Sequence, residues 1–231
     1  MKAFLLAAGL GTRLRPLTDS TPKCLLPIRG VPLLAIWLDL CHRHGIDEVL
    51  INTHCHGETV RRYLVAHRNA VRTRVVDEPV LLGSAGTILA NRDWVARESC
   101  FWVIYADVLT AAGLSPMAQF HLTRQGVATL GAYEVPDPER CGIMDVNPEG
   151  LIQSFVEKPK RPRSRLAFAG LMIANAGLFD AFSGAVPADL GFDILPRLVG
   201  RMFAYQISDY LLDIGTIENY ELAQRTWPGL D

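Results

Sequence analysis

Short apolar runs and amphipathic stretches alternate through the first half of the chain. The apolar runs predict buried strands at residues 3–6, 48–53, 72–76 and 100–105. Between them lie predicted helices at residues 32–44 and 58–67, and a further helix opens at 86–91. This βαβα order is typical of an α/β fold with a doubly wound, mostly parallel sheet flanked by helices.

The second half of the chain has a different pattern, in which strands follow one another with turn residues between them. The predicted strands cover residues 127–135, 142–146, 151–156, 166–173 and 202–206. The predicted helices lie near residues 176–182 and 192–199 and at 217–225. No internal repeat or low-complexity linker interrupts this order, so we expect a mixed sheet in a single domain over residues 1–231.

Composition restricts the class of partner. The chain has 231 residues, of which 49% are apolar, and this suffices for one sizeable core. Its net charge of −1 predicts no affinity for nucleic acid or for an anionic membrane. No apolar run reaches the roughly 18 residues of a membrane span. Five cysteines without a Cys-x-x-Cys pair are typical of a reduced protein, so we expect a cytoplasmic location.

A glycine-rich loop with two cations follows the first predicted strand. Gly9 and Gly11 allow backbone dihedrals that a Cβ would forbid, and consecutive N–H groups in such a loop form an anion cradle. Arg13 and Lys23 add fixed positive charges beside it. Leu14 stands where the dinucleotide fingerprint needs a third glycine, and the Gly-Lys-Ser/Thr of the Walker pattern is absent. The loop therefore predicts a site for a nucleoside triphosphate.

The stretch 9–28 carries Gly-x-Gly-Thr-Arg-Leu, Pro-Leu-Thr, Pro-Lys and Pro-Ile in this order. In these elements the chain resembles the sugar-1-phosphate nucleotidyltransferases. The later string Glu-Pro…Gly-Ser-Ala-Gly, residues 78–86, is similar to that of the members that act on mannose 1-phosphate or manno-heptose 1-phosphate with GTP. The resemblance covers nearly all of the chain and implies a Rossmann-like catalytic domain. It assigns residues 1–110 to the nucleoside triphosphate and residues 111–231 to the sugar 1-phosphate.

The resemblance also implies a wider role. Such enzymes supply nucleotide sugars, for instance for polysaccharide synthesis. Short members of the class often form homodimers, although no patch in this sequence indicates one.

By this resemblance the nucleotide is bound by the first strand, the loop and two later segments. The implied nucleotide-binding residues are Leu6, Ala7, Ala8, Gly9, Gly11, Thr12, Arg13, Lys23, Glu78, Gly83 and Asp107. Arg13, Lys23 and Asp107 are the expected catalytic residues. Arg13 would neutralise charge on pyrophosphate, Lys23 would contact the α-phosphate, and Asp107 would hold a metal ion.

Two carboxylates are the expected ligands of Mg²⁺, the cofactor that the resemblance implies. Asp107 follows the strand at 100–105, where ligands collect in doubly wound sheets, although Ala106 replaces the usual glycine. Asp213 lies in an Asp-x-Gly-Thr motif. Two carboxylates with phosphate oxygens and water make an oxygen shell that suits Mg²⁺. The alternatives are a turn or cap role for Asp107 and a helix-cap role for Asp213.

A Glu-Lys-Pro segment matches the family's sugar-phosphate site. Lys158 is expected to bind the phosphate, and Glu157 is expected to accept hydrogen bonds from sugar hydroxyls. Gly142 matches a position where the backbone approaches the sugar. Phe168 replaces the family's sugar-binding asparagine, and in this it is similar to N-acetylmuramate-1-phosphate uridylyltransferases. Asn175 is displaced from that position.

Glu78 is the candidate for recognising the base. An ionised carboxylate only accepts hydrogen bonds. Guanine offers two adjacent donors on its pairing edge, whereas uracil and thymine offer one donor flanked by acceptors. Glu78 therefore favours GTP, and the alternative is that Glu78 is an exposed loop residue.

Other functions stay open at this point. They are uridylyl transfer to N-acetylmuramate 1-phosphate, cytidylyl transfer to a phosphorylated alcohol, and a nucleotide sensor that does no chemistry. A second basic stretch, from Lys160 to Arg165, either suits a polyanionic substrate or forms a solvated loop.

Overall fold

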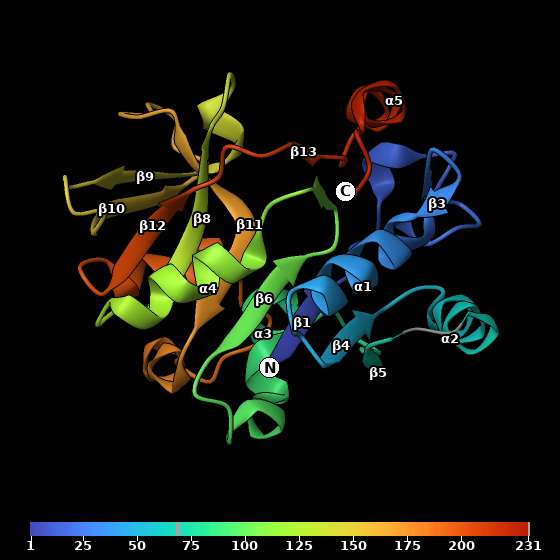
Figure 1. The fold of residues 1–231 in the computed structure, drawn as a ribbon, viewed down its shortest axis with the longest axis horizontal. Helices are drawn as coiled ribbons and strands as arrows, with labels where there is room; N and C mark the ends of the chain where they lie inside the picture. The colour runs from blue at the N-terminus through green and yellow to red at the C-terminus, as the bar shows by residue number, and fades with distance from the viewer. Residues whose placement is uncertain (68–69, 231) are drawn as a thin grey trace. The chain divides into compact units, whose positions relative to one another are not determined.

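The computed structural model describes residues 1–67 and 70–230 (Figure 1). They form two compact units, each assembled from separate segments of the chain. Unit 1 takes residues from Met1–Leu81, Ile104–Leu114 and Asp209–Asp231, and unit 2 takes residues from Leu82–Val103 and Ser115–Ser208. This grouping differs from the predicted halves 1–110 and 111–231, because the C-terminal segment belongs to the same unit as the N-terminal one. The division of the halves by substrate stays a prediction.

Unit 1 contains a set of parallel strands that begins the chain. β1 (Lys2–Leu6) pairs in parallel with β4 (Glu48–Thr53), and β4 pairs in parallel with β5 (Arg72–Asp77). The connections between them contain α1 (Leu33–Arg43) and α2 (Gly57–Ala66). The middle residues of β1 are fully buried, as expected for a strand covered on both faces. The predicted βαβα order is confirmed in this unit.

Two short strands from distant parts of the sequence meet in unit 1. β7 (Val108–Thr110) pairs antiparallel with β13 (Leu211–Asp213), and α5 (Ile217–Thr226) follows β13. The red segment β13 therefore lies beside a green strand (Figure 1). β6 (Phe101–Tyr105) leads into β7 and is divided between the two units. The pairing brings the end of the chain to the residues that follow β6.

Unit 2 contains mainly antiparallel strands. β9 (Gly142–Val146) pairs antiparallel with β10 (Ile152–Glu157), and β11 (Leu166–Ala174) pairs antiparallel with both β8 (Ala128–Glu134) and β9. β12 (Met202–Gln206) pairs in parallel with β8. Together with the parallel strands of unit 1, these pairings confirm the predicted α/β class with a mixed sheet.

Two helices predicted in unit 2 are irregular. The segment near 176–182 forms a 3-10 helix at Ala176–Ala181. The segment near 192–199 forms a π-helix at Leu190–Ile194 that passes into a 3-10 helix at Leu195–Leu198. Pro196 has no backbone N–H to donate, so regular α-helical hydrogen bonding does not continue through it.

Several elements were not predicted. α4 (Leu114–Thr123) buries residues at helical spacing, namely Leu114, Met117 and His121. The two-residue strands β2 (Pro27–Ile28) and β3 (Val31–Pro32) form a small hairpin. α3 (Gly83–Ala90) begins earlier than the helix predicted at 86–91. Within residues 1–67 and 70–230, every helix is too short or too polar to cross a membrane.

Candidate functional site

A cavity of about 350 Å³ lies within unit 1 at the carboxyl end of β1. Its wall includes most of the residues predicted to bind the nucleotide, namely Leu6, Ala7, Gly9, Gly11, Thr12, Arg13, Lys23 and Asp107. It also includes residues that were not predicted, namely Leu10, Cys24, Leu81, Ala106 and Gly215. The predicted residues Ala8, Glu78 and Gly83 do not line it. The fold therefore brings the glycine-rich loop, both cations and one carboxylate around a single space.

The loop after β1 is held by hydrogen bonds to its backbone. Gly11 has a φ of +63°, in the left-handed region, and precedes a 3-10 helix at Thr12–Leu14. The Thr18 hydroxyl donates to the Gly11 carbonyl at 2.8 Å, and a Cβ on Gly11 would lie 2.9 Å from the Thr18 methyl carbon. Glycine is thus required by both dihedral angle and space. At the end of β1, the Ala7 N–H donates to the Asn52 side-chain oxygen at 2.7 Å.

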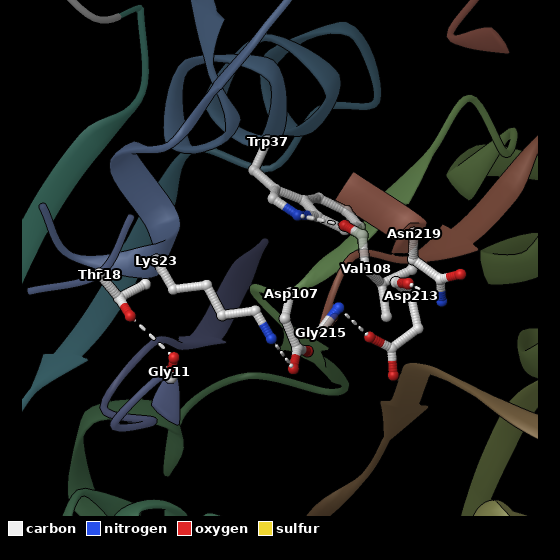
Figure 2. A network of polar contacts seen from close by, with 9 residues as sticks. All are labelled: Gly11, Thr18, Lys23, Trp37, Asp107, Val108, Asp213, Gly215 and Asn219. Atoms are coloured by element: carbon white, nitrogen blue, oxygen red, sulfur yellow. Dashed lines mark hydrogen bonds and ion pairs between the residues drawn. The ribbon is translucent and has the colours of Figure 1, made fainter. Parts of the chain in front are cut away.

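Lys23 and Asp107 form an ion pair at the cavity wall. Lys23 Nζ lies 2.8 Å from Asp107 Oδ2, and the two side chains are 12% and 33% exposed (Figure 2). The backbone around Asp107 is fixed on two sides. The Ala106 N–H donates to the Leu6 carbonyl at 3.0 Å, and the Ile214 N–H donates to the Asp107 carbonyl at 2.9 Å. Asp107 is therefore tied both to the end of β1 and to the residue after β13.

Asp213 is the last residue of β13 and lies near Asp107. It pairs in antiparallel register with Val108, the residue after Asp107. Its Oδ1 accepts a hydrogen bond from the Gly215 N–H at 2.6 Å (Figure 2). Burial raises the pKa of the Asp213 carboxyl, the Asp107 carboxylate raises it further, and nearby cations oppose this. A bound divalent cation would relieve the repulsion between two such carboxylates.

Gly215 is the point where the charged side chains meet. A Cβ on Gly215 would lie 2.7 Å from Asp213 Oδ1, 3.0 Å from Arg13 Nη2 and 3.4 Å from Lys23 Nζ. Lys23 in turn pairs with Asp107. Four charged groups therefore surround one small volume. Its two carboxylates are of the donor type that Mg²⁺ prefers, and its two cations can bind phosphate oxygens. The donor set thus fits the metal that the sequence implied.

Neighbouring hydrogen bonds hold this arrangement in place. The Trp37 indole N–H donates to the Val108 carbonyl at 2.9 Å, and the Asn219 side-chain amide donates to the Asp213 carbonyl at 2.7 Å (Figure 2). Thr216 is the N-cap of α5, because its hydroxyl accepts a hydrogen bond from the Asn219 N–H. The alternative that Asp213 caps this helix is therefore wrong.

Cys24 is the thiol in the cavity wall. Cys24 is 2% exposed, and burial raises the pKa of its thiol to about 12. The thiol is therefore neutral at physiological pH and is a poor nucleophile. Chemistry in this cavity accordingly depends on the charged groups rather than on attack by Cys24.

Glu78 is buried in unit 1 rather than exposed in a loop. The residue is 4% exposed, and its carboxylate accepts a hydrogen bond from the Asn52 side-chain amide at 2.8 Å. Asn52 in turn accepts the hydrogen bond from the Ala7 N–H. The exposed-loop alternative is therefore wrong, and Glu78 supports the residue that holds the end of β1. A contact between Glu78 and a base stays a prediction.

The residues predicted to bind the sugar phosphate lie together in unit 2. Glu157 pairs in register with Gly142, and a Cβ on Gly142 would lie 2.6 Å from Glu157 Oε2. Phe168 follows Ala167, which pairs with the residue after Gly142, so strand alternation places Phe168 on the Gly142 face. Lys158 Nζ lies 3.8 Å from Glu157 Oε1. One face thus presents a carboxylate, an ammonium group and an aromatic ring.

Two other candidates from the sequence have local structural roles in unit 2. Gly83 has a φ of +77° and packs against the backbone of Ala188, so a side chain at Gly83 would be strained and crowded. The Asn175 side-chain oxygen accepts a hydrogen bond from the Gly177 N–H at 2.9 Å, and its amide donates to the Gly126 carbonyl at 3.0 Å. Asn175 therefore stabilises a turn.

Known proteins match this chain over most of its length. A family model described as nucleotidyl transferase matches residues 2–227. The mannose-1-phosphate guanyltransferase of Saccharomyces cerevisiae is 28% identical over 229 residues, which are 95% of this chain and 63% of that protein. The mannose-1-phosphate guanylyltransferase 1 of Arabidopsis thaliana is 28% identical over 227 residues, with the same two shares. The chain thus spans less than two thirds of the length of these relatives.

Solved structures share the fold. HddC from Yersinia pseudotuberculosis, complexed with GMP-PN, has a TM-score of 0.81 and 22% identity, covering 98% of this chain and 99% of that one. A UDP-glucose pyrophosphorylase complexed with UDP-glucose has a TM-score of 0.85 and 25% identity, covering 98% and 97%. These similarities confirm the predicted Rossmann-like fold.

Proposed function

Because the chain belongs to the nucleotidyl transferase family, we propose that it transfers a nucleoside monophosphate from a nucleoside triphosphate to a sugar 1-phosphate. The observation that carries this proposal is the convergence of Arg13, Lys23, Asp107 and Asp213 around Gly215, next to the glycine-rich loop. A nucleotide sensor without chemistry would need no such paired carboxylates. Transfer at phosphorus requires charge neutralisation on several oxygens at once, and this set of residues can supply it.

In the proposed reaction an oxygen of the sugar 1-phosphate attacks the α-phosphorus of the triphosphate. The bond from that phosphorus to the β-phosphate oxygen breaks, and pyrophosphate leaves. Backbone N–H groups of the loop from Gly9 to Thr12 bind the triphosphate, Lys23 binds the α-phosphate, and Arg13 neutralises charge on pyrophosphate. The phosphate nucleophile is already ionised, so no protein nucleophile is needed. Catalysis consists of positioning and charge neutralisation.

Asp107 and Asp213 are the residues that would hold Mg²⁺. When bound there, Mg²⁺ supplies a Lewis acid for phosphate oxygens. In its absence, Lys23 neutralises Asp107 by direct ion pairing. The same lysine therefore has two roles, since it balances the carboxylate charge in the free protein and contacts the α-phosphate in the complex.

Replacing Thr18 by valine is expected to weaken triphosphate binding about fivefold. Valine keeps the shape of the side chain but removes the hydroxyl that donates to the Gly11 carbonyl, and one such hydrogen bond contributes about 1 kcal/mol. Titration of the protein with GTP and UTP measures the change in Kd. Thr18→Ser keeps the hydroxyl and serves as the control. Equal affinity in Thr18→Val and wild type would contradict a role of this bond in shaping the loop.

We assign the sugar 1-phosphate to the face of unit 2 that carries Glu157, Lys158, Gly142 and Phe168. Lys158 would bind the phosphate and reduce the repulsion between two anionic substrates. Glu157 would accept hydrogen bonds from sugar hydroxyls, and Gly142 lets that carboxylate lie close to the backbone, where a Cβ would be 2.6 Å from Glu157 Oε2. Phe168 offers an apolar surface for one side of the sugar ring.

The specificity constant for the sugar phosphate is expected to decrease as the pH falls. This decrease should begin at a higher pH than protonation of a glutamate with an ordinary pKa would produce. Burial raises the pKa of the Glu157 carboxyl above its usual 4.5, and Lys158 only partly opposes this. The ionised carboxylate is the acceptor for sugar hydroxyls, so binding is present above the raised pKa and is lost as the pH falls through it. Measuring kcat/KM between about pH 4.5 and 8 checks this effect.

The matched variant for this pH effect is Glu157→Gln. It lowers kcat/KM about tenfold or more at neutral pH, because a hydrogen bond to a charged acceptor is lost. Glu157→Gln also removes the part of the decrease in kcat/KM at acidic pH that comes from protonation of Glu157. The part caused by protonation of the substrate phosphate remains. An identical pH profile in both proteins would contradict the assignment.

The substrates that we propose are GTP and a mannose-type or manno-heptose-type sugar 1-phosphate. The support is the similarity to mannose-1-phosphate guanylyltransferases over 95% of the chain. Uridylyl transfer is the second candidate, because the UDP-glucose pyrophosphorylase shares 25% identity and because Phe168 stands where an asparagine is usual. Glu78 does not line the cavity, so it supports the choice of base less directly than the sequence suggested.

Pyrophosphate release with Mg²⁺ tests the proposed function. GTP, UTP, CTP, dTTP and ATP are crossed with the 1-phosphates of mannose, manno-heptose, glucose and N-acetylmuramate. Activity confined to GTP with a manno-configured sugar is the expected result. A preference for UTP would support the proposed reaction but contradict the proposed choice of guanine as the base. No activity from a folded protein that still binds triphosphate overturns the proposal in favour of a sensor.

A further inference from the structure

Unit 2 contains a second cavity that the proposed reaction does not use. It has a volume of about 330 Å³ and lies over β9 and β10 and the loop that follows β10. The walls from the strands are Ile143, Asp145, Ser154 and Val156. The loop contributes Pro159 and three basic residues, Lys160, Arg161 and Arg163. We call this cavity the β9–β10 groove. Its size is in the range of small-molecule sites.

The β9–β10 groove lies on the opposite face of the two strands from the sugar-phosphate residues. In the antiparallel register Ser154 pairs with Asp145, and Val156 pairs with Ile143. Glu157 pairs with Gly142 in the next position. Residues that face each other across a strand pair share a face, and successive residues alternate. The groove is therefore a separate site and not an extension of the surface that carries Glu157.

Among the residues that the structure describes, the cations of the β9–β10 groove have no partners of opposite charge. Lys160, Arg161 and Arg163 are exposed and make no ion pair or hydrogen bond with any of the described residues. Three like charges within four residues repel one another, and an anion between them would relieve this repulsion. Asp145 is the acidic residue in the wall, so the groove keeps an excess of positive charge.

The remaining wall residues restrict the ligand further. Asp145 and Ser154 lie opposite each other and offer acceptor and hydroxyl groups, which suit ligand hydroxyls. Ile143, Val156 and Pro159 offer an apolar surface for a ring. From these features we propose that the β9–β10 groove binds a small polyhydroxylated ligand with two or more negative phosphate charges, such as a sugar bisphosphate or a nucleoside diphosphate.

Lys158 connects the basic loop of the groove to the sugar-phosphate face, so we expect binding in the groove to affect that face. This residue joins β10 to the basic loop and has a φ of +48°, in the left-handed region where non-glycine residues are strained. Its N–H donates to the Cys141 carbonyl at 2.9 Å. A ligand that draws the loop toward Asp145 and Ser154 acts directly on this strained residue. The coupling, unlike the binding itself, rests on the proposed function and predicts a change in KM for the sugar phosphate.

Titration of the ¹⁵N-labelled full chain tests the binding without any activity measurement. The probes are fructose 1,6-bisphosphate and GDP, and the readout is the amide signals of Asp145 and Ser154. Saturable shifts of these signals are expected with at least one probe. The probe that binds more tightly shows whether the groove prefers a sugar bisphosphate or a nucleoside diphosphate. In K160Q/R161Q/R163Q the apparent Kd from these signals should rise about tenfold or more. The control R62Q/R92Q/R97Q removes the same charge elsewhere and should leave the Kd unchanged.

A second variant guards against loss of the loop structure. Ser154→Phe leaves the three cations in place and fills the β9–β10 groove, so it should abolish the shifts as well. Shifts confined to the first cavity, for instance at Lys23, would overturn the proposal. The same apparent Kd in wild type and in K160Q/R161Q/R163Q would also overturn it. Neither result bears on transfer to a sugar phosphate, which the pyrophosphate assay tests separately.

Discussion

Replacing Asp107 by asparagine is expected to lower turnover about a thousandfold or more, with the fold intact. The substitution removes the carboxylate charge that pairs with Lys23 and that would hold Mg²⁺. In the proposed reaction charge neutralisation at the reacting phosphate is the main contribution to catalysis, so its loss is expected to affect kcat more than triphosphate binding. Pyrophosphate release under saturating substrates measures the effect, and circular dichroism checks the fold.

The control for this experiment is Asp209→Asn, which removes the same charge from an exposed position in unit 1. Its turnover should stay near that of the wild type. If Asp107→Asn retains most of its turnover, Asp107 is a structural partner of Lys23 and the metal site must be sought elsewhere.

Replacing Asp213 by asparagine should lower turnover to a similar extent but make the metal-free protein more stable. Burial and the Asp107 carboxylate raise the pKa of Asp213 in the folded state, so at neutral pH the folded protein carries this negative charge at a cost. Asparagine removes the charge and still offers an oxygen to the Gly215 N–H. We expect a gain of about 1 kcal/mol, which corresponds to roughly 2–4 °C in Tm for a chain of this size.

Thermal unfolding with a chelator and with Mg²⁺ measures both parts of this prediction. With the chelator, Asp213→Asn should unfold at a higher temperature than the wild type. With Mg²⁺ the wild type should gain stability by binding the ion, and the variant should gain less. A variant that is less stable under both conditions would mean that the carboxylate contributes more through Arg13 and Lys23 than it costs by burial.

Local patterns predicted most of the strands because turn residues mark where these strands begin and end. The strands at residues 142–146 and 202–206 have the predicted limits. β7 and β13 were missed because each has three residues, too few for a periodic pattern, and because each depends on a partner far away in the sequence. α4 was missed although its buried positions have helical spacing.

The site was predictable where a motif is continuous in the sequence and not where it is assembled by the fold. The loop from Gly9 to Arg13 could be recognised from its sequence motif, and it lines the cavity. Leu81 also lines the cavity, yet no local signal marks it. Gly215 had a signal, because it belongs to the Asp-x-Gly-Thr motif. The bond between Glu78 and Asn52 joins the ends of two strands, and residue types alone do not indicate it.

The pairing of β7 with β13 has a consequence for the order in which the molecule matures. Asp213 follows Asp107 by 106 positions, from 107 to 213, and the chain enters unit 2 and returns between them. During synthesis, Asp107 therefore leaves the ribosome well before its neighbouring carboxylate exists. Contacts of such long sequence separation form late in folding. The glycine-rich loop is thus present early in a growing chain, whereas the carboxylate pair is complete only after β13 has emerged.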